Sequence, residues 1–179
     1  FINQAIETLI NINEIKQQSP IKSFEELEKR FGIIYLAPMN ILELDEKKYK
    51  FDAIISTSTF EHIPKNDLIE ILKKFKNLSR YIISHVDYSD HYSHSDKSID
   101  RVNFLSMSKN IWIKHNHNNF YQNRLRHKNY QDIFKRLKFT ILDNEAKNYV
   151  KKPIKKPLKE NLTGHKTDLA TTGRWILKI

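Results

Sequence analysis

Residues 51–75, FDAIISTSTFEHIPKNDLIEILKKF, decide the fold that we expect for this chain. The apolar run at 53–55 is short and rich in β-branched residues, which is typical of a strand buried on both faces of a parallel sheet. After Pro64, apolar residues recur every three or four positions up to Phe75, which predicts an amphipathic helix. A strand, a short polar turn and a crossover helix form the unit in which α/β proteins bind ligands, because the strand ends open a crevice there.

Two helices and a strand are expected before this unit. Residues 2–12 carry apolar residues at helical spacing. Ser23 and Glu26 have the spacing of a capping box at the start of a second helix, which Gly32 would end. The apolar run 33–36 then predicts a short buried strand.

The second half of the chain mixes strands and helices. The expected elements are a strand at 80–87, a helix followed by a segment that covers the site over 103–113, a helix at 129–137, and strands at 138–143 and 174–179. The last two strands have no periodic helix between them, so they can pair antiparallel. Residues 147–168 are rich in lysine and proline, which indicates a loop or an insertion. We therefore expect an α/β fold, a partial Rossmann-like sheet flanked by helices with a C-terminal antiparallel strand pair.

The composition limits the class of protein. A chain of 179 residues can bury one substantial core, so we expect a single domain over 1–179. The absence of cysteine excludes disulfides, thiolate metal ligands and a cysteine nucleophile. No apolar run is long enough to span a membrane, and we expect a cytoplasmic protein with no membrane partner.

The net charge of +10 suits a polyanionic partner such as nucleic acid. The lysines are, however, spread along the chain and are not gathered with aromatic residues on one expected face, as single-strand binders arrange them. The charge therefore does not favour nucleic acid as a partner, although it leaves that partner open.

Three stretches of the chain, in this order, carry a resemblance to a known family. FDAIISTSTFEHIP (51–64) has Phe-Asp before an apolar run and Glu-His-Ile after it, and HVDYSDHYSHSDKSIDRVNFL (85–105) and YQNRLRHKNY (121–130) follow. Together they resemble class I S-adenosylmethionine-dependent methyltransferases, and within them a subgroup found among bacterial surface-polysaccharide genes. The resemblance covers residues 33–146. It implies a methyltransferase-like sheet, S-adenosylmethionine as cofactor and a small-molecule or sugar-linked methyl acceptor.

The resemblance also implies how the adenine of the cofactor would be held. Asn40 stands where the family usually has an aspartate that accepts a hydrogen bond from the adenine amino group, and an amide oxygen can accept the same bond. Ile41 would pack on the ring. An asparagine of an ordinary turn is an equal alternative for Asn40.

The loop after the strand at 51–57 would run beside the methionine part of the cofactor in this family. Ser56, Thr57 and Ser58 are the residues so placed, and Glu61 and His62 begin the helical turn that follows. For His62 we favour a competing interpretation, in which a half-buried histidine holds the turn.

A glycine-rich turn that the family uses to hold its cofactor cannot be assembled from this sequence. The glycines are Gly32, Gly164 and Gly173, which are scattered. The chain also begins with Phe1 inside a helical pattern. We therefore expect an N-terminally truncated domain that binds S-adenosylmethionine weakly or not at all. An oligomer is compatible with this expectation, because an edge strand left uncovered favours association.

The densest polar cluster of the chain, 88–96, follows the strand at 80–87 and supplies the catalytic candidates. His85 and Asp87 would point to the same side of that strand, and Asp90 and His91 come next. A histidine beside an aspartate can take a proton from a hydroxyl or amine acceptor. The same side chains can bind a divalent metal, or they can form a polar lid tied to its own backbone. Because no close paired spacing of metal ligands is present, we predict no metal site.

Two arginines, Arg124 and Arg126, are candidates for binding an anionic group of the acceptor through bidentate hydrogen bonds, with surface ion pairs as the alternative. Two functions therefore remain. The first is a methyltransferase, and the second is a noncatalytic domain of the same fold that binds anions or nucleic acid through these arginines and the lysines.

Overall fold

The computed structural model describes residues 20–116, 120–150 and 156–179. The chain divides into two compact units, Phe1–Asn40 and Ile41–Ile179, where its length led us to expect one domain. Each unit is described by itself. The helix expected at 2–12 lies outside the described residues.

Helix α2 (Phe24–Phe31) has both of its expected ends. The Oγ atom of Ser23 accepts a hydrogen bond from the N–H of Glu26 at 3.1 Å. Gly32 ends the helix at a φ of 66°, a left-handed conformation that favours glycine. The Glu26 carboxylate accepts from the N–H of Lys22 instead of that of Ser23, so the bond that would complete the capping box is shifted by one residue.

The prediction of a buried strand at 33–36 is wrong. Residues 32–40 form neither helix nor strand, and the side chains of Ile34 and Tyr35 are exposed. An extended run becomes a strand only where a neighbour pairs its N–H and C=O groups. The described sheet gives this run no such neighbour.

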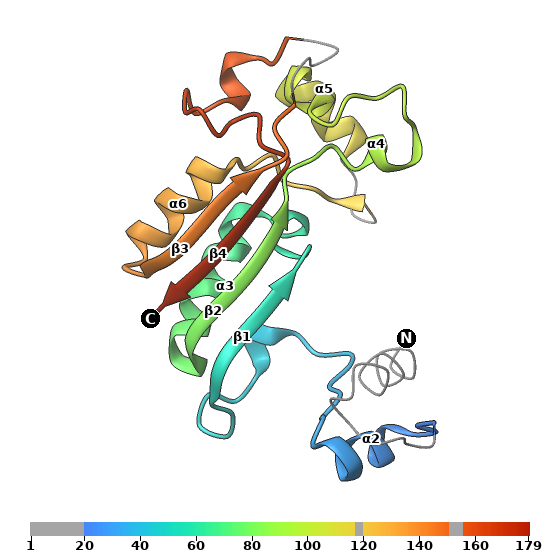
Figure 1. The fold of residues 1–179 in the computed structure, drawn as a ribbon, viewed down its shortest axis with the longest axis vertical. Coiled ribbons are helices and arrows are strands. Elements are labelled where there is room, and N and C mark those ends of the chain that lie inside the picture. Colours follow the sequence, from blue (N-terminus) through green and yellow to red (C-terminus); the bar gives the residue numbers. More distant parts are fainter. Residues whose placement is uncertain (1–19, 117–119, 151–155) are drawn as a thin grey trace. The chain divides into compact units, whose positions relative to one another are not determined.

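The unit Ile41–Ile179 is built on a four-stranded sheet in the order β1-β2-β4-β3. The strands are β1 (Phe51–Thr57), β2 (Ser79–Asp87), β3 (Thr140–Lys147) and β4 (Thr172–Lys178). β1 and β2 run parallel, whereas β4 is antiparallel to both β2 and β3 (Figure 1). The expected α/β class and the C-terminal antiparallel pair are therefore confirmed.

Helices and short 3-10 turns connect and cover the strands. In chain order they are η1 (Ile41–Glu43), η2 (Phe60–His62), α3 (Lys65–Leu78), α4 (Tyr92–Ser95), η3 (Asn103–Ser106), α5 (Lys109–His115), α6 (His127–Arg136) and η5 (Lys159–Asn161). Over 103–113, where we expected a helix and then a covering segment, the chain forms η3 and α5, and Ser108 caps the start of α5 by accepting from the N–H of Ile111. None of the helices that the structure describes is long and apolar enough to cross a membrane.

Helices α3 and α6 pack on the same face of the sheet. Leu72 of α3 and Phe134 of α6 belong to one buried core together with Ile82 of β2 and Trp175 of β4. The apolar spacing that predicted α3 is what places its buried side chains on this face. The carboxyl ends of β1 and β2 point toward the end of the sheet where α4 and α5 lie (Figure 1).

Strand β1 forms where it was expected, but it is not buried. In the part of the chain that the structure describes it is an edge strand whose one neighbour is β2, and Ile55 is 72% exposed. Ile83 of β2 is exposed on the same outer face, because side chains alternate along a strand and Ile82 faces the core. The apolar run resembled a fully buried strand because its side chains are apolar on both faces, and sequence pattern does not reveal which neighbours are present.

Candidate active site

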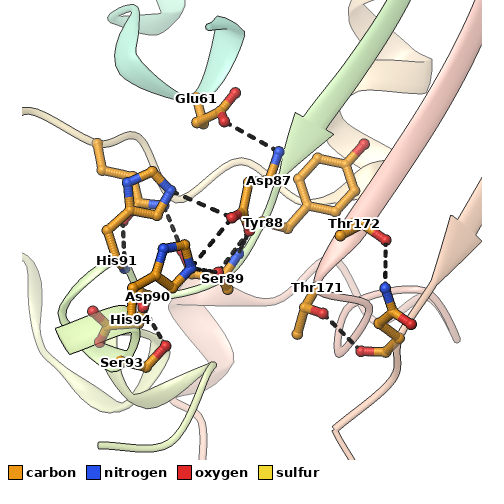
Figure 2. Close-up of polar contacts among 12 residues, drawn as sticks. Glu61, Asp87, Tyr88, Ser89, Asp90, His91, Ser93, His94, Thr171 and Thr172 are labelled. Carbon is orange, nitrogen blue, oxygen red and sulfur yellow. Dashed lines mark hydrogen bonds and ion pairs between the residues drawn. The ribbon is translucent and has the colours of Figure 1, made fainter. Parts of the chain in front are cut away.

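Polar side chains gather where the two parallel strands end. Glu61 and His62 lie in η2, just after β1, while Asp87 is the last residue of β2 and His91 immediately precedes α4. His94 lies within α4. We call these five residues the carboxyl-end cluster. They meet because parallel strands open a crevice at their carboxyl ends, and Figure 2 shows four of them, Glu61, Asp87, His91 and His94.

The turn η2 is held in place by Asn123, which comes from a distant part of the chain. The side-chain amide of Asn123 donates to the carbonyls of Phe60 and Ile63, both at 2.9 Å. Its main-chain N–H donates to the carbonyl of Glu61 at 2.7 Å. This clamp fixes the direction in which Glu61 projects.

Glu61 is a buried acid, only 1% exposed. Its Oε1 atom accepts a hydrogen bond from the N–H of Asp87 at 3.2 Å, as Figure 2 shows. Its Oε2 atom is buried and has no partner among the described residues. Burial raises the pKa of the Glu61 carboxyl to about 7, because desolvation disfavours the charged form.

Asp87 is the centre of the cluster. Its Oδ1 atom accepts from both the N–H and the hydroxyl of Ser89, at 2.8 and 2.6 Å. Its Oδ2 atom lies 3.4 Å from Nε2 of His94 and 3.8 Å from Nε2 of His91. The Ser89 hydroxyl uses its one hydrogen in the bond that it donates to Asp87. In the 2.9 Å contact between Oγ of Ser89 and Nε2 of His94, the histidine nitrogen is therefore the donor.

His91 is half-buried between the other two histidines. Its ring centre lies 4.9 Å from that of His62 and 5.0 Å from that of His94. Its Nε2 atom is buried without a hydrogen-bond partner in the part of the chain that the structure describes. Burial lowers the pKa of the His91 imidazole, because desolvation disfavours the cation. The main-chain N–H of His91 donates to the side chain of Gln122 at 3.3 Å.

His62 has one of its two ring nitrogens committed. Nδ1 lies 2.9 Å from the carbonyl oxygen of Tyr121. A carbonyl can only accept, so Nδ1 carries the proton and the lone pair is on Nε2. The histidine thus holds the segment at Tyr121 and still presents a basic nitrogen, but its side chain is exposed and not buried or half-buried as expected.

Two catalytic candidates from the sequence lie apart from this cluster. The side chain of His85 is exposed on the outer face of the sheet, and no hydrogen bond or ion pair among the described contacts joins it to the five residues of the cluster. Asp90 is fully buried, and its Oδ1 atom accepts from the N–H of Tyr92. Asp90 thereby closes the turn before α4, as the lid alternative describes.

The predicted cofactor residues are distributed over both units of the chain. Asn40 ends the first unit and Ile41 begins the second. Thr57 ends β1 and Ser58 begins the exposed loop that follows, where Ser58 has a φ of 47° and donates its N–H to the carbonyl of His85. Ser56 faces the helix side of the sheet, and its Oγ is buried without a partner in the described region.

Arg126 is completely buried, and its guanidinium is used within the protein. It donates to the main-chain carbonyls of Tyr88 at 2.6 Å, Asp168 at 2.7 Å and Ala170 at 2.5 Å. Burial lowers its pKa to about 10, so it stays charged at neutral pH. Its guanidinium joins the end of β2 to the segment that leads into β4, which leaves it no access to an acceptor in this structure.

Arg124 lies beside a cavity of about 450 Å³ that Lys65 and Lys109 also line. Its Nη1 atom donates to the carbonyls of Phe104 and Met107, and the guanidinium lies 5.7 Å from the centre of the Trp112 ring. Unlike Arg126, it is only partly buried. Arg124 therefore remains the candidate for an anionic group.

The segment 121–123 connects the carboxyl-end cluster to this cavity. Tyr121, Gln122 and Asn123 all line the cavity, and each also bonds to the cluster or its turn, through His62, His91 and Glu61 respectively. Sequence reasoning missed this connecting role, and it missed His94. The only sequence signal for His94 was its place in the dense polar stretch, whereas Gln122 gave none.

The sequence matches no protein-family model and no curated protein. Among solved structures, a SAM dependent methyltransferase from Archaeoglobus fulgidus is 13% identical, with 98% of this chain and 81% of that chain covered and a TM-score of 0.50. An S-adenosylmethionine-dependent methyltransferase from Clostridium acetobutylicum ATCC 824 is 16% identical, with 88% and 72% covered and a TM-score of 0.48. At such identities the likeness to the Archaeoglobus protein shows the fold alone. The chain therefore has a methyltransferase-like α/β fold.

Proposed function

We propose that this chain is part of an S-adenosylmethionine-dependent methyltransferase. The enzyme would act on a small-molecule or sugar-linked acceptor in the cytoplasm. The observation that carries the proposal is the carboxyl-end cluster, which brings an acid and three histidines together with Asp87 beside the loop after β1. In open α/β sheets, ligands bind outside the carboxyl ends of the strands, which is where this cluster lies.

The loop after β1 fits the polar end of the cofactor. Thr57 and Ser58 are exposed and lie directly before the turn that carries Glu61, so a ligand bound there would meet both the hydroxyls and the cluster. Ser58 is held by its bond to the carbonyl of His85, which keeps the loop against β2. When bound, S-adenosylmethionine supplies an electrophilic methyl group on a sulfonium.

Asp87 is suited to accept the proton that an acceptor hydroxyl or amine loses as it takes the methyl group. The Asp87 carboxylate is oriented by two bonds from Ser89, and its second oxygen faces the histidines. A positive charge arising on a histidine there would be stabilised by the carboxylate. Most of the rate enhancement would come from positioning the acceptor.

The basic cavity supports an acceptor that carries an anionic group, such as a carboxylate or phosphate. Arg124 and two lysines line it, and the segment 121–123 connects it to the cluster. The proposal of a sugar-linked acceptor rests on the sequence resemblance to enzymes of surface-polysaccharide gene clusters. The same cavity favours the second candidate function, a noncatalytic anion-binding domain.

The two candidates are separated by an assay for transfer of a labelled methyl group, at millimolar S-adenosylmethionine, to hydroxyl and amine acceptors with and without anionic groups. We expect transfer, and a loss of about 100-fold or more in Asp87→Asn. The matched control is Asp96→Asn, since Asp96 accepts from the N–H and hydroxyl of Ser98 at 2.8 and 2.7 Å but is exposed. Binding of anionic acceptors without any transfer would favour the noncatalytic function.

A further inference from the structure

Three side chains of the carboxyl-end cluster have the arrangement of a metal centre. Glu61, His62 and His91 each offer one ligand atom, and these atoms all lie within 4.8 Å of one another. Two of the residues come from η2 and the third from the segment before α4. We propose that these three residues bind one divalent transition-metal ion. This inference does not depend on the proposed methyl transfer.

Two donor atoms of these residues are available to an ion. Oε2 of Glu61 and Nε2 of His91 are both buried, and neither has a hydrogen-bond partner among the described residues. A buried polar atom without a partner costs free energy, so such atoms are rare in native proteins. A bound cation would satisfy both at once, which gives a physical reason for their presence at one place.

The surrounding hydrogen bonds orient the same atoms. The Tyr121 carbonyl accepts the proton of Nδ1 of His62, which leaves the Nε2 lone pair available for an ion. The N–H of Asp87 binds Oε1 of Glu61, which leaves Oε2 as the available oxygen. Metal-binding histidines and carboxylates in proteins are oriented in this way by carbonyl and N–H groups that are not themselves ligands.

The donor set indicates which ions fit. Two imidazoles and one carboxylate suit zinc, cobalt, iron and related ions, whereas magnesium and calcium favour oxygen ligands. Ligands of one such ion lie about 3 to 4 Å apart, because each bond is roughly 2.0–2.2 Å long. The observed spread of 4.8 Å thus requires only a small side-chain movement on binding.

Three protein ligands leave at least one position open for another molecule, as in catalytic metal sites. Asp87 lies close to such an ion, because its Oδ2 atom is 3.8 Å from Nε2 of His91. If the proposed function holds, an acceptor oxygen bound there would become more acidic, and Asp87 would be placed to take its proton. The sequence led us to expect no metal site, because it has no close paired spacing of metal ligands. That spacing does not detect this group, since His91 is distant in sequence from Glu61 and His62.

The test is a titration of the chain, after removal of metal with a chelator, with Co²⁺ followed by visible absorption and with Zn²⁺ followed by calorimetry. We expect one ion per chain and an absorption band typical of nitrogen and oxygen ligands. Mg²⁺ should give no comparable binding. No saturable binding of Co²⁺ or Zn²⁺ would overturn the inference.

Variants locate the site. Glu61→Gln and His91→Gln should each weaken binding at least tenfold, whereas His115→Gln, an exposed histidine of α5, should leave it unchanged. Full affinity in His91→Gln, or loss of binding in His115→Gln, would contradict the assignment. Since Glu61 is buried and its variant can lose stability, the half-buried His91 decides the outcome if Glu61→Gln does not fold.

The two proposals fail separately. Metal binding that depends on Glu61 and His91 without any methyl transfer would sustain the metal site and oppose the enzyme. Methyl transfer that persists in the presence of chelator, together with no binding of Co²⁺, would sustain the enzyme and oppose the metal site.

Discussion

The hydroxyl oxygen of Tyr88 accepts a hydrogen bond from Nε1 of Trp175 at 3.0 Å. This bond joins the end of β2 to β4 in the middle of the core. The Tyr88 hydroxyl in turn lies 3.2 Å from Nδ1 of His127, whose Nε2 lies 3.1 Å from Oδ1 of Asn144. Each group in this line has the proton it needs when His127 is neutral with its proton on Nε2. The line fixes the end of the strand that carries Asp87.

We expect the stability of the protein to fall in mild acid because of His127. Burial lowers the pKa of its imidazole from the ordinary value of 6.5, and its ring is stacked 4.1 Å from that of Trp175. The unfolded chain therefore binds this proton more strongly than the folded one. The contribution of His127 to the free energy of unfolding is complete above the pKa of the unfolded chain. It is lost as the pH falls from that value toward the lower pKa of the folded protein.

Urea denaturation between about pH 7.5 and 5.5 measures this effect, as the difference between the wild type and His127→Gln. The difference is needed because other groups also titrate, among them Glu61, whose raised pKa acts in the opposite direction. The variant should have a smaller dependence on pH over this range. An equal dependence in both proteins would mean that His127 is not the group responsible.

Gly173→Ala should destabilise the protein by about 1–3 kcal/mol through overpacking. A methyl group at this position of β4 would overlap the Tyr88 ring, with Cε2 of that ring only 2.6 Å away. Tyr88 cannot move easily, because it is buried and bonded to Trp175. Thermal unfolding measures the change, and Lys178→Ala on the same strand is an exposed control. A variant as stable as the wild type would show that Tyr88 has room to shift.

Arg126→Met should cost about 3 kcal/mol or more, because it leaves buried carbonyls of Tyr88, Asp168 and Ala170 without their donor. Arg136→Met, at the exposed end of α6, is the matched control and should change the free energy of unfolding by less than about 0.5 kcal/mol. Urea denaturation compares the two. A selective loss of acceptor binding in Arg126→Met at unchanged stability would instead support the anion-binding role expected from sequence.

Local signals in the sequence predicted much of the fold. The caps at Ser23 and Gly32 and the apolar spacing of α3 act between residues near in sequence, so they could be read without a structure. The exposure of β1 could not be predicted from the sequence, since it depends on which strands and helices lie beside it. The strand expected at 33–36 failed for the same reason.

The candidate site was predicted in part. Asp87 and His91 were indicated by the dense polar stretch after β2, and the structure places them together. His85 was grouped with Asp87 by strand alternation, but its side chain remains on the exposed face of the sheet. Arg124 and Arg126 are alike in sequence and differ in burial, because only Arg126 points into the core between Tyr88 and Phe104. Such differences arise from packing between distant segments.

The most direct test of cofactor binding at the loop after β1 is a titration of the ¹⁵N-labelled chain with S-adenosylhomocysteine. Amide chemical shifts follow the titration, because they detect even weak binding and locate it. We predict that the amides of Thr57, Ser58 and Glu61 shift in a saturable manner, while those of the exposed face of α3 do not. Shifts confined to the basic cavity around Arg124, or no shifts at the loop after β1, would contradict a methyltransferase function for this site.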